Sequence, residues 1–335
     1  MTITPFGTTK DGQGVEAITL TSSELSVTIL TLGAILNDVR LTRVAYPLTL
    51  GARTVAGYEG PLSSFGSFMG PVINRIKGCQ ATIDGKAYTF ERHRSGDVTQ
   101  HSGSTGLQKQ LWQVTDHGAD HVTLQIDLPD GLGGFPGNRL VTAQYQITGA
   151  ALRLTVTATT DAPTLMNPAN HSYWALDPEL GFAGHVLTVH ADHFTEAGPD
   201  LVPTGQVLPV TGTPYDFRAG KVLAGDDSQF YDINLCLSDT RRPLRPVATL
   251  RGTSGVELTM STTECGLQVY DCGTIRAPDF PTHHDQPYMP YSGVALEAQS
   301  WPGAVAHDHF PRIHLYPGAV YSPVTEWEFI NRGES

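Results

Sequence analysis

The chain has 335 residues, of which 40% are hydrophobic and 16% charged, and its 33 acidic and 21 basic side chains give a formal net charge of −12. These values are typical of a globular protein that is long enough to bury a large core. No run of Lys and Arg is present, which argues against nucleic acid and anionic membrane surfaces as partners, because both are bound mainly through cationic side chains.

The first residues of the chain and its cysteines bear on the expected cellular location of the protein. Met1–Lys10 lacks a cationic leader followed by an apolar core, so we expect no secretory signal. No uninterrupted apolar run of about 18 residues occurs, so we expect no membrane-spanning helix. The cysteines form no CxxC pair, and we expect reduced thiols in a cytoplasmic protein, with a Cys265–Cys272 bridge as the alternative.

Short runs of alternating apolar and polar residues recur along the chain, and this period of two is typical of half-buried strands. The clearest predicted strands are Ser26–Leu30, Ala81–Ile83, Ala87–Phe90, His121–Leu128, Leu140–Ile147 and Ala151–Thr159. Asp84-Gly85 and Thr148-Gly149-Ala150 separate two pairs of these runs and predict tight hairpin turns, because Asp and Gly tolerate positive φ.

The order of the predicted elements decides the fold class. Helical periodicity is nearly absent, and 35 glycines and 23 prolines supply the turns that many short strands need. Strands that follow one another without helices exclude a doubly wound α/β sheet and favour an all-β fold built as a large antiparallel sandwich. Since no repeat, low-complexity tract or linker interrupts the pattern, we expect a single domain over residues 1–335.

Several familiar motifs are missing. The chain has no GxSxG elbow and no P-loop, and the glycine-rich stretch Asp130–Asn138 fails the dinucleotide-binding spacing, so we expect a structured loop there. The tracts His283-His284-Asp285 and His307-Asp308-His309 lack a metal-ligand spacing, and we expect solvated histidines without a metal.

Two segments carry side chains suited to chemistry. Asn167–Trp174 combines two Asn, one His and two aromatic residues, which offers hydrogen bonds beside a flat apolar surface, as a sugar requires; a core histidine with a structural Asn pair is the alternative. Gly293–Trp301 places one carboxylate, Glu297, in a strand of apolar and small residues. Such a Glu either faces solvent or is held inward with a shifted pKa.

Taken together and in this order, the segments resemble the aldose 1-epimerase (galactose mutarotase) family from about Gly33 to near the C-terminus. The matching positions are Asn74-Arg75-Ile76, Asp84-Gly85-Lys86, Tyr88, His101, Gly103, Gly134–Asn138, Asn170-His171-Ser172-Tyr173, Asp232, Glu264, Gly266, Gln268 and Glu297.

The resemblance implies a β-supersandwich and an isomerase that interconverts the α and β anomers of a free aldose without a cofactor or a metal. His171 would be the general acid and Glu297 the general base, with Glu297 ionised and His171 partly protonated beside Asp232. The residues implied to bind or orient the sugar are Asn74, Arg75, His101, Tyr173, Asp232 and Gln268.

Three segments depart from the family pattern, at Gln100-His101-Ser102-Gly103, at Asp232-Ile233-Asn234 and at Glu264-Cys265-Gly266. The acid and the base are retained, so the departures leave catalysis intact. We expect the changed positions to border the substrate and to affect the preference between glucose and galactose.

Three other functions stay open at this point. A non-catalytic sugar-binding protein on the same scaffold could lose the acid or the base, which this chain keeps. An epimerase of a phosphorylated or modified sugar would need extra cations, for which Arg92 and Arg94 are candidates. A glycoside-cleaving enzyme would need two carboxylates, such as Glu297 and Asp232, and would leave His171 without a task. The expected partner is a small monosaccharide, and the expected assembly is a monomer or a homodimer.

Overall fold

The computed structural model describes residues 1–93, 96–228, 230–277 and 279–333, and strands dominate these ranges. The strands are β1 Thr2–Thr8, β2 Gly14–Thr21, β3 Leu25–Leu30, β4 Leu36–Leu41, β5 Phe68–Met69, β6 Arg75–Lys77, β7 Gln80–Ile83, β8 Lys86–Thr89, β9 Val98–Gln100, β10 Gln113–His117, β11 His121–Leu128, β12 Arg139–Thr148, β13 Ala151–Thr160, β14 Thr164–Leu165, β15 Ala169–Asn170, β16 Tyr173–Trp174, β17 Val186–Val189, β18 His193–Ala197, β19 Pro203–Pro209, β20 Lys221–Val222, β21 Asp232–Cys236, β22 Arg245–Arg251, β23 Val256–Thr262, β24 Gly266–Tyr270, β25 Val294–Gln299, β26 His314–Leu315 and β27 Val324–Asn331. The helical turns are α1 Val55–Tyr58, η1 Gly103–Thr105, η2 Leu107–Lys109 and η3 Leu132–Gly134.

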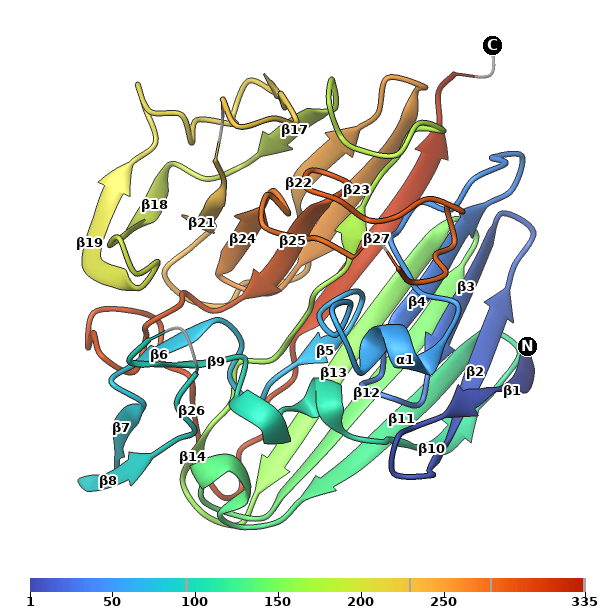
Figure 1. Ribbon diagram of the computed structural model, residues 1–335. Helices are drawn as coiled ribbons and strands as arrows, with labels where there is room; N and C mark the ends of the chain where they lie inside the picture. The colour runs from blue at the N-terminus through green and yellow to red at the C-terminus, as the bar shows by residue number, and fades with distance from the viewer. Residues whose placement is uncertain (94–95, 229, 278, 334–335) are drawn as a thin grey trace.

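The strands form three large antiparallel sheets. One has nine strands in the order β10-β11-β12-β13-β27-β23-β22-β17-β20, one has six in the order β16-β25-β24-β21-β18-β19, and one has four in the order β1-β2-β3-β4. Figure 1 shows β1–β4, in blue, beside β10–β13, in green. The predicted all-β antiparallel sandwich is therefore confirmed.

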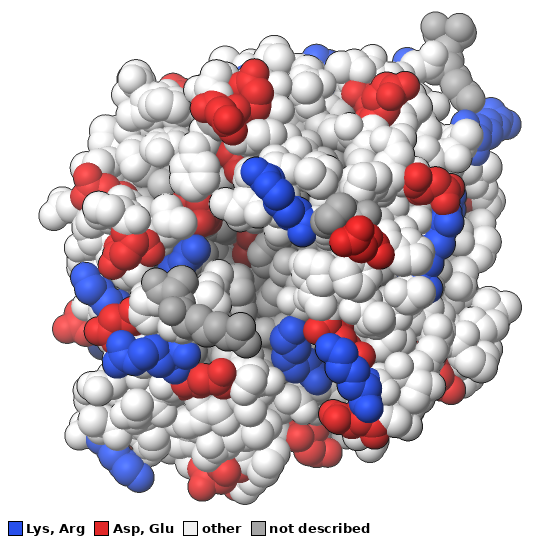
Figure 2. All heavy atoms as spheres, in the orientation of Figure 1, with Lys and Arg blue, Asp and Glu red and all other residues white. Residues whose placement is uncertain are grey.

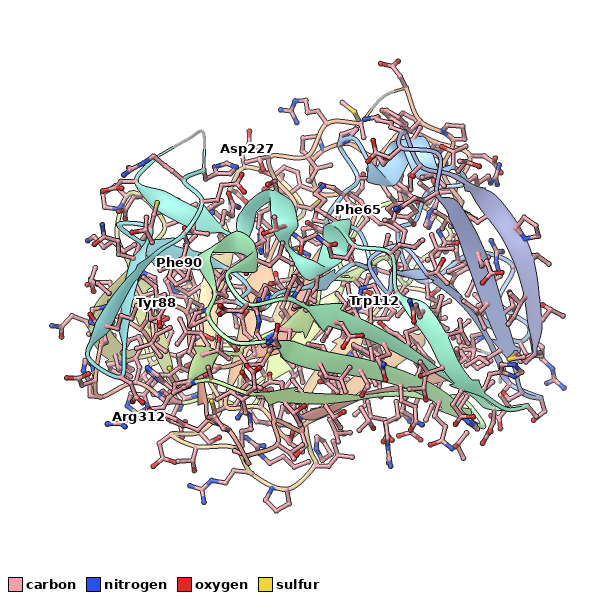
Figure 3. The ribbon with its side chains drawn as sticks, turned by 90° about the horizontal axis from the view of Figure 1, so that it is seen from below. Phe65, Tyr88, Phe90, Trp112, Asp227 and Arg312 are labelled. Carbon is pink, nitrogen blue, oxygen red and sulfur yellow. The ribbon has the colours of Figure 1, made fainter. Side chains whose placement is uncertain are left out.

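The sheets pack face to face around one large apolar core. Ile233, Leu267 and Leu296 from the six-stranded sheet lie in the same buried cluster as Leu250 and Leu258 from the nine-stranded sheet. Burying one such side chain contributes about 1.5–3 kcal/mol, so this shared core is what holds the two sheets together. Seen from below, side chains fill the molecule, with Trp112 toward one end and Phe90 and Tyr88 toward the other (Figure 3).

The alternation along three strands of the six-stranded sheet separates core from site. In β21, Ile233 points into the core while its neighbours Asp232 and Asn234 belong to the other face. Asn234 pairs in register with Gln268 of β24, and Gln268 pairs with Glu297 of β25. The polar residues of three separated segments therefore form one row on the face opposite the core.

The predicted hairpins are present. Asp84 and Gly85 have φ values of 48° and 75° at the turn between β7 and β8, which is the positive φ that such a turn requires. The predicted strand Ala87–Phe90 ends one residue earlier, at Thr89. Phe90 follows the strand; its backbone N–H still donates to the Cys79 carbonyl oxygen at 2.8 Å, and its ring stacks on Phe135, with centroids 4.4 Å apart.

The glycine-rich stretch Asp130–Asn138 is an ordered loop, as predicted. The Asp130 carboxylate accepts a hydrogen bond from the backbone N–H of Gly137 at 2.6 Å, and Asn138 Oδ1 accepts one from the backbone N–H of Asp130 at 3.0 Å. Gly134 has a φ of 87°, and a Cβ atom there would lie 2.2 Å from the Thr89 carbonyl oxygen, so the loop can approach β8 only with glycine at this position.

Candidate active site

A cavity of about 690 Å³ opens on the polar face of the six-stranded sheet. Figure 2 shows the molecule hollowed near the centre of this face. Of the eight candidate residues from the sequence, seven line the cavity; they are Asn74, Arg75, His101, His171, Tyr173, Asp232 and Glu297. A cavity of this size is typical of small-molecule sites in proteins.

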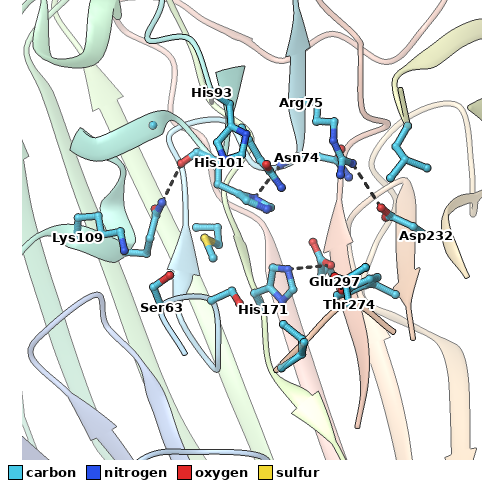
Figure 4. Close-up of a pocket in the computed structure, with 18 of the residues that line it drawn as sticks. Ser63, Asn74, Arg75, His93, His101, Lys109, His171, Asp232, Thr274 and Glu297 are labelled. Carbon is cyan, nitrogen blue, oxygen red and sulfur yellow. Dashed lines mark hydrogen bonds and ion pairs between the residues drawn. The ribbon is translucent and has the colours of Figure 1, made fainter. Parts of the chain in front are cut away.

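His171 and Glu297 form a close pair at the bottom of the cavity. His171 Nε2 lies 3.3 Å from Glu297 Oε1, and the two residues are 4% and 2% exposed (Figure 4). Glu297 is held by the central strand β25, and His171 follows β15. The backbone N–H of His171 donates to the Ser67 carbonyl oxygen at 2.9 Å, which fixes the segment that carries the imidazole.

Burial shifts both pKa values of this pair toward the neutral forms. It lowers the pKa of His171 to about 4 and raises the pKa of Glu297 well above its usual value. The charge of Asp232 raises the pKa of Glu297 further, while Arg75 opposes that shift. Both shifts oppose an ionised Glu297 beside a protonated His171, so that charge state stays a prediction. The charge of Asp232 acts on the pKa of Glu297. The pKa of His171 is set chiefly by desolvation, which lowers it.

Arg75, Asp232 and Gln268 form a second polar group on the wall. Arg75 Nη1 lies 3.5 Å from Asp232 Oδ2, and Gln268 Nε2 donates to Asp232 Oδ1 at 2.6 Å. Burial raises the pKa of Asp232, and both partners oppose that shift. Gln268 is 4% exposed and does not line the cavity, so it is placed to act on a ligand through Asp232.

His101 and Asn74 hold each other in unusual backbone conformations. Their φ values are 48° and 64°, and the backbone N–H of Asn74 donates to His101 Nδ1 at 3.2 Å. Since Nδ1 accepts this bond, a neutral His101 carries its proton on Nε2 and offers a donor. Burial lowers the pKa of His101, and the nearby His171 and Arg75 lower it further, which favours that neutral form. The rings of His101 and His171 are 5.6 Å apart.

Tyr173 supports the imidazole from the side. Its ring centroid lies 5.0 Å from that of His171 and 4.4 Å from that of Phe65, on which it stacks. Its hydroxyl lies 3.3 Å from Ser64 Oγ. The aromatic residue of the predicted Asn-His-Ser-Tyr segment therefore both borders the cavity and limits the rotation of His171.

The upper wall contains residues that sequence reasoning missed. They come from segments outside the strands with no recognisable pattern, one of them the helical turn η2, and include Ser63, Lys109, Leu201, Phe230 and Ile275. Phe230 is 50% exposed, although it is a large aromatic side chain. Its position two residues before Asp232 is the only signal that could have identified it.

Most departures from the family pattern lie away from the cavity. The residues that differ from the family pattern are Gln100, Ser102, Ile233 and Cys265. Of these four, only Gln100 lines the wall, so the expectation that the changed positions border the substrate is wrong for the other three. Ser102 is buried, and its hydroxyl hydrogen-bonds both backbone groups of Val72 at 2.9 Å. Ile233 belongs to the large core, and Cys265 packs with Trp301 and Phe310.

Of the remaining histidine candidates, His309 is exposed as expected, whereas the expectation of solvated side chains is wrong for His283, His284 and His307, which are half-buried. His283 Nε2 lies 3.0 Å from Asn37 Oδ1, and His309 Nε2 lies 2.8 Å from the Gly205 carbonyl oxygen. Among the residues that the structure describes, no three His, Cys, Asp or Glu side chains come together as a metal site. The cysteines are free, so the alternative Cys265–Cys272 bridge is not formed. Arg94 lies outside the described residues.

No helix within the described ranges of the chain is long and apolar enough to cross a membrane.

Comparisons with known proteins point to one family. A family model described as aldose 1-epimerase matches residues 16–328. A galactose mutarotase from Rattus norvegicus is 32% identical over 98% of both chains, and an aldose 1-epimerase from Escherichia coli is 30% identical over 96% of both. The crystal structure of an aldose epimerase homologue from C. elegans superposes with a TM-score of 0.87 at 28% identity, covering 94% of this chain and 98% of that one.

Proposed function

Because the chain belongs to the aldose 1-epimerase family, whose members are isomerases that interconvert the anomers of a free aldose, we propose that His171 and Glu297 are its acid and base. The observation that supports this assignment is the pair itself. An imidazole nitrogen and a carboxylate oxygen lie 3.3 Å apart at the bottom of a cavity large enough for a sugar. A positioned acid or base typically contributes about 10²–10⁴-fold to the rate.

The reaction proceeds through ring opening. The Glu297 carboxylate removes the proton from the C1 hydroxyl while His171 donates its Nε2 proton to the ring oxygen, and the bond between C1 and the ring oxygen breaks. The resulting aldehyde rotates about the C1–C2 bond. The former ring oxygen then attacks the opposite face of C1, returning its proton to His171, while Glu297 returns its proton to the carbonyl oxygen.

The number of protons on the pair stays constant through this cycle. Ring opening converts an ionised Glu297 and a protonated His171 into a neutral carboxylic acid and a neutral imidazole, and closure reverses the change. The neutral arrangement is the one that burial favours in the free protein. We therefore propose that the shared proton passes from Glu297 to His171 Nε2, 3.3 Å away, when the sugar binds, and that ring opening returns the pair to the neutral arrangement.

The other residues of the cavity would bind the sugar. Arg75 and Asp232 offer a donor and an acceptor for neighbouring hydroxyl groups, with Gln268 holding Asp232 in place. His101 offers its Nε2 proton, and Asn74 fixes that tautomer. Tyr173 keeps the His171 ring in position. We also propose a monosaccharide as the partner, a monomer or homodimer as the assembly, and the cytoplasm as the location, which the free thiols support.

Polarimetry tests the assignment. Freshly dissolved α-anomers of glucose, galactose, xylose and arabinose should equilibrate faster with the wild type, and the fastest of them identifies the preferred sugar. We expect His171→Asn and Glu297→Gln each to lower kcat by about 10²-fold or more. His117→Asn and Glu328→Gln, which change the same residue types at exposed positions outside the cavity, serve as matched controls. Wild-type rates in the His171 and Glu297 variants would refute the acid–base pair.

A further inference from the structure

A second, much smaller cavity lies behind the floor of the active site. Its volume is about 10 Å³, and its lining includes Asn170, which precedes His171, and Ala298, which follows Glu297. Because successive side chains of a strand point to opposite faces, Ala298 points to the core side of β25, away from the sugar cavity. The small cavity therefore lies between the sheets, directly behind the two catalytic residues.

A buried carboxylate borders this cavity with one oxygen unused. Glu264 is 1% exposed, and its Oε1 accepts hydrogen bonds from Arg241 Nε at 3.0 Å and from the Tyr321 hydroxyl at 3.1 Å. Its Oε2 is buried and has no hydrogen-bond partner among the described residues. The mechanism makes no use of Glu264, although this carboxylate belongs to the segments that resemble the family.

A buried donor borders the same cavity. Trp327, in β27, is 1% exposed, and its indole Nε1 is also without a partner among the residues that the structure describes. The indole N–H and the carboxylate oxygen make no hydrogen bond with each other, although both side chains line one small space. Leaving a buried donor and a buried acceptor unpaired is unfavourable, and native proteins resolve such pairs with an ordered water molecule.

We infer that one water molecule is bound in this cavity, accepting a hydrogen bond from Trp327 Nε1 and donating one to Glu264 Oε2. A volume of about 10 Å³ matches a single water molecule and excludes larger solutes. The hydroxyl of Thr325, which also lines the cavity, lies 3.1 Å from Thr262 Oγ1 and keeps a lone pair to accept the second proton. The site joins the nine-stranded sheet to the segment before β24, and it is independent of the proposed function.

Water contacts of the indole protons test this site in the whole protein. Two other tryptophans provide internal controls, because Trp112 Nε1 donates to the Leu107 carbonyl oxygen at 3.2 Å and Trp301 Nε1 to the Cys265 carbonyl oxygen at 2.9 Å. In a rotating-frame Overhauser spectrum we expect a cross-peak between the Trp327 indole proton and water, and none for Trp112 and Trp301. An assigned Trp327 proton without that cross-peak would overturn the inference.

Variants assign the Trp327 indole signal and distinguish bound water from a relay through a hydroxyl proton. Trp327→Phe should delete the indole signal that shows the cross-peak; if this variant does not fold, Trp→Phe changes at the other three positions assign Trp327 by elimination. In Thr325→Val the Thr325 hydroxyl proton can no longer relay magnetisation from bulk water, while the bound water keeps its hydrogen bonds to Trp327 and Glu264. Persistence of the cross-peak in that variant supports bound water, and its loss counts against the site.

Discussion

At the scale of single residues, desolvation governs the pKa values of the proposed acid–base pair. His171 and Glu297 are almost fully buried, and their pKa values move in opposite directions because burial disfavours the charged form of each. The two shifts widen the pH range over which the pair holds one proton. That single proton is what ring opening requires, since one group must accept while the other donates.

The shared proton predicts the pH dependence of kcat/KM. Below the His171 pKa of about 4 the pair gains a second proton and loses its base, so activity falls on the acid side near that value. Above the raised pKa of Glu297 the pair loses its only proton, so activity falls again on the alkaline side. A pH series of initial mutarotation rates at low sugar concentration measures this profile. An acid limb near 6.5, the ordinary histidine value, would contradict the desolvated pair.

Gln268 predicts a separate effect on binding. In Gln268→Leu the Asp232 carboxylate loses its 2.6 Å hydrogen bond while remaining buried. Because a buried hydrogen bond to a charged group contributes about 1.5–3 kcal/mol, we expect KM to rise roughly tenfold or more with a smaller change in kcat. Gln144→Leu, which removes an amide bonded to Thr123 on another sheet, is the matched control. A fall in kcat alone would argue against Asp232 as a sugar ligand.

At the scale of elements, the sheets hold the site and the connections complete it. β21, β24 and β25 supply Asp232, Gln268 and Glu297 in register, so the distances between them follow from strand pairing. His171, Asn74 and His101 come from irregular segments between short strands. Those segments depend on side-chain to backbone hydrogen bonds such as Ser102 to Val72, which explains why a serine is accommodated there.

The loop before β12 provides a stability test at this scale. Gly131 and Gly134 both have positive φ, 79° and 87°, but a Cβ atom at Gly131 would meet nothing within 4 Å, whereas one at Gly134 would lie 2.2 Å from a carbonyl oxygen. We expect Gly131→Ala to lower the free energy of unfolding by about 1–2 kcal/mol and Gly134→Ala by a further 1–3 kcal/mol or so. Urea denaturation measures both. Equal losses of unfolding free energy in the two variants would mean that the close approach of Gly134 to β8 does not add to the cost of the substitution.

At the scale of the whole molecule, histidines that are fully or partly buried influence the response to acid. Six of them have lowered pKa values, chiefly because of burial: His101, His171, His185, His283, His284 and His314. Between their folded pKa values, about 4 for His171 and His284, and the unfolded value near 6.5, the unfolded chain binds more protons. Protonation of these histidines therefore favours unfolding within that pH window.

This imbalance predicts a lower Tm at pH 5 than at pH 7. The raised pKa values of Asp232, Asp271, Glu297 and His121 act in the opposite direction, but these four groups are fewer than the six histidines. Calorimetric scans across this range measure the change, and His284→Gln should make the dependence less steep. A Tm that rises on acidification would show that these four groups dominate.

The sequence alone determined the fold class and the identity of the catalytic candidates. Alternation with a period of two is a local property of a half-buried strand, so runs such as His121–Leu128 and hairpin turns such as Asp84-Gly85 could be predicted without any tertiary contact. The resemblance to the aldose 1-epimerase family added His171 and Glu297, because the motifs that contain them follow one another along the chain in the order typical of the family.

Only the tertiary structure decided the charge state and the boundary of the site. The protonation of His171 and Glu297 depends on desolvation by residues distant in the chain, which no local pattern encodes. The same holds for Gln268 lying behind Asp232, for Ile233 facing the core, and for Phe230 at the cavity wall. Whether a residue borders a cavity depends on which distant segments pack against it, and that is settled only when the sheets come together.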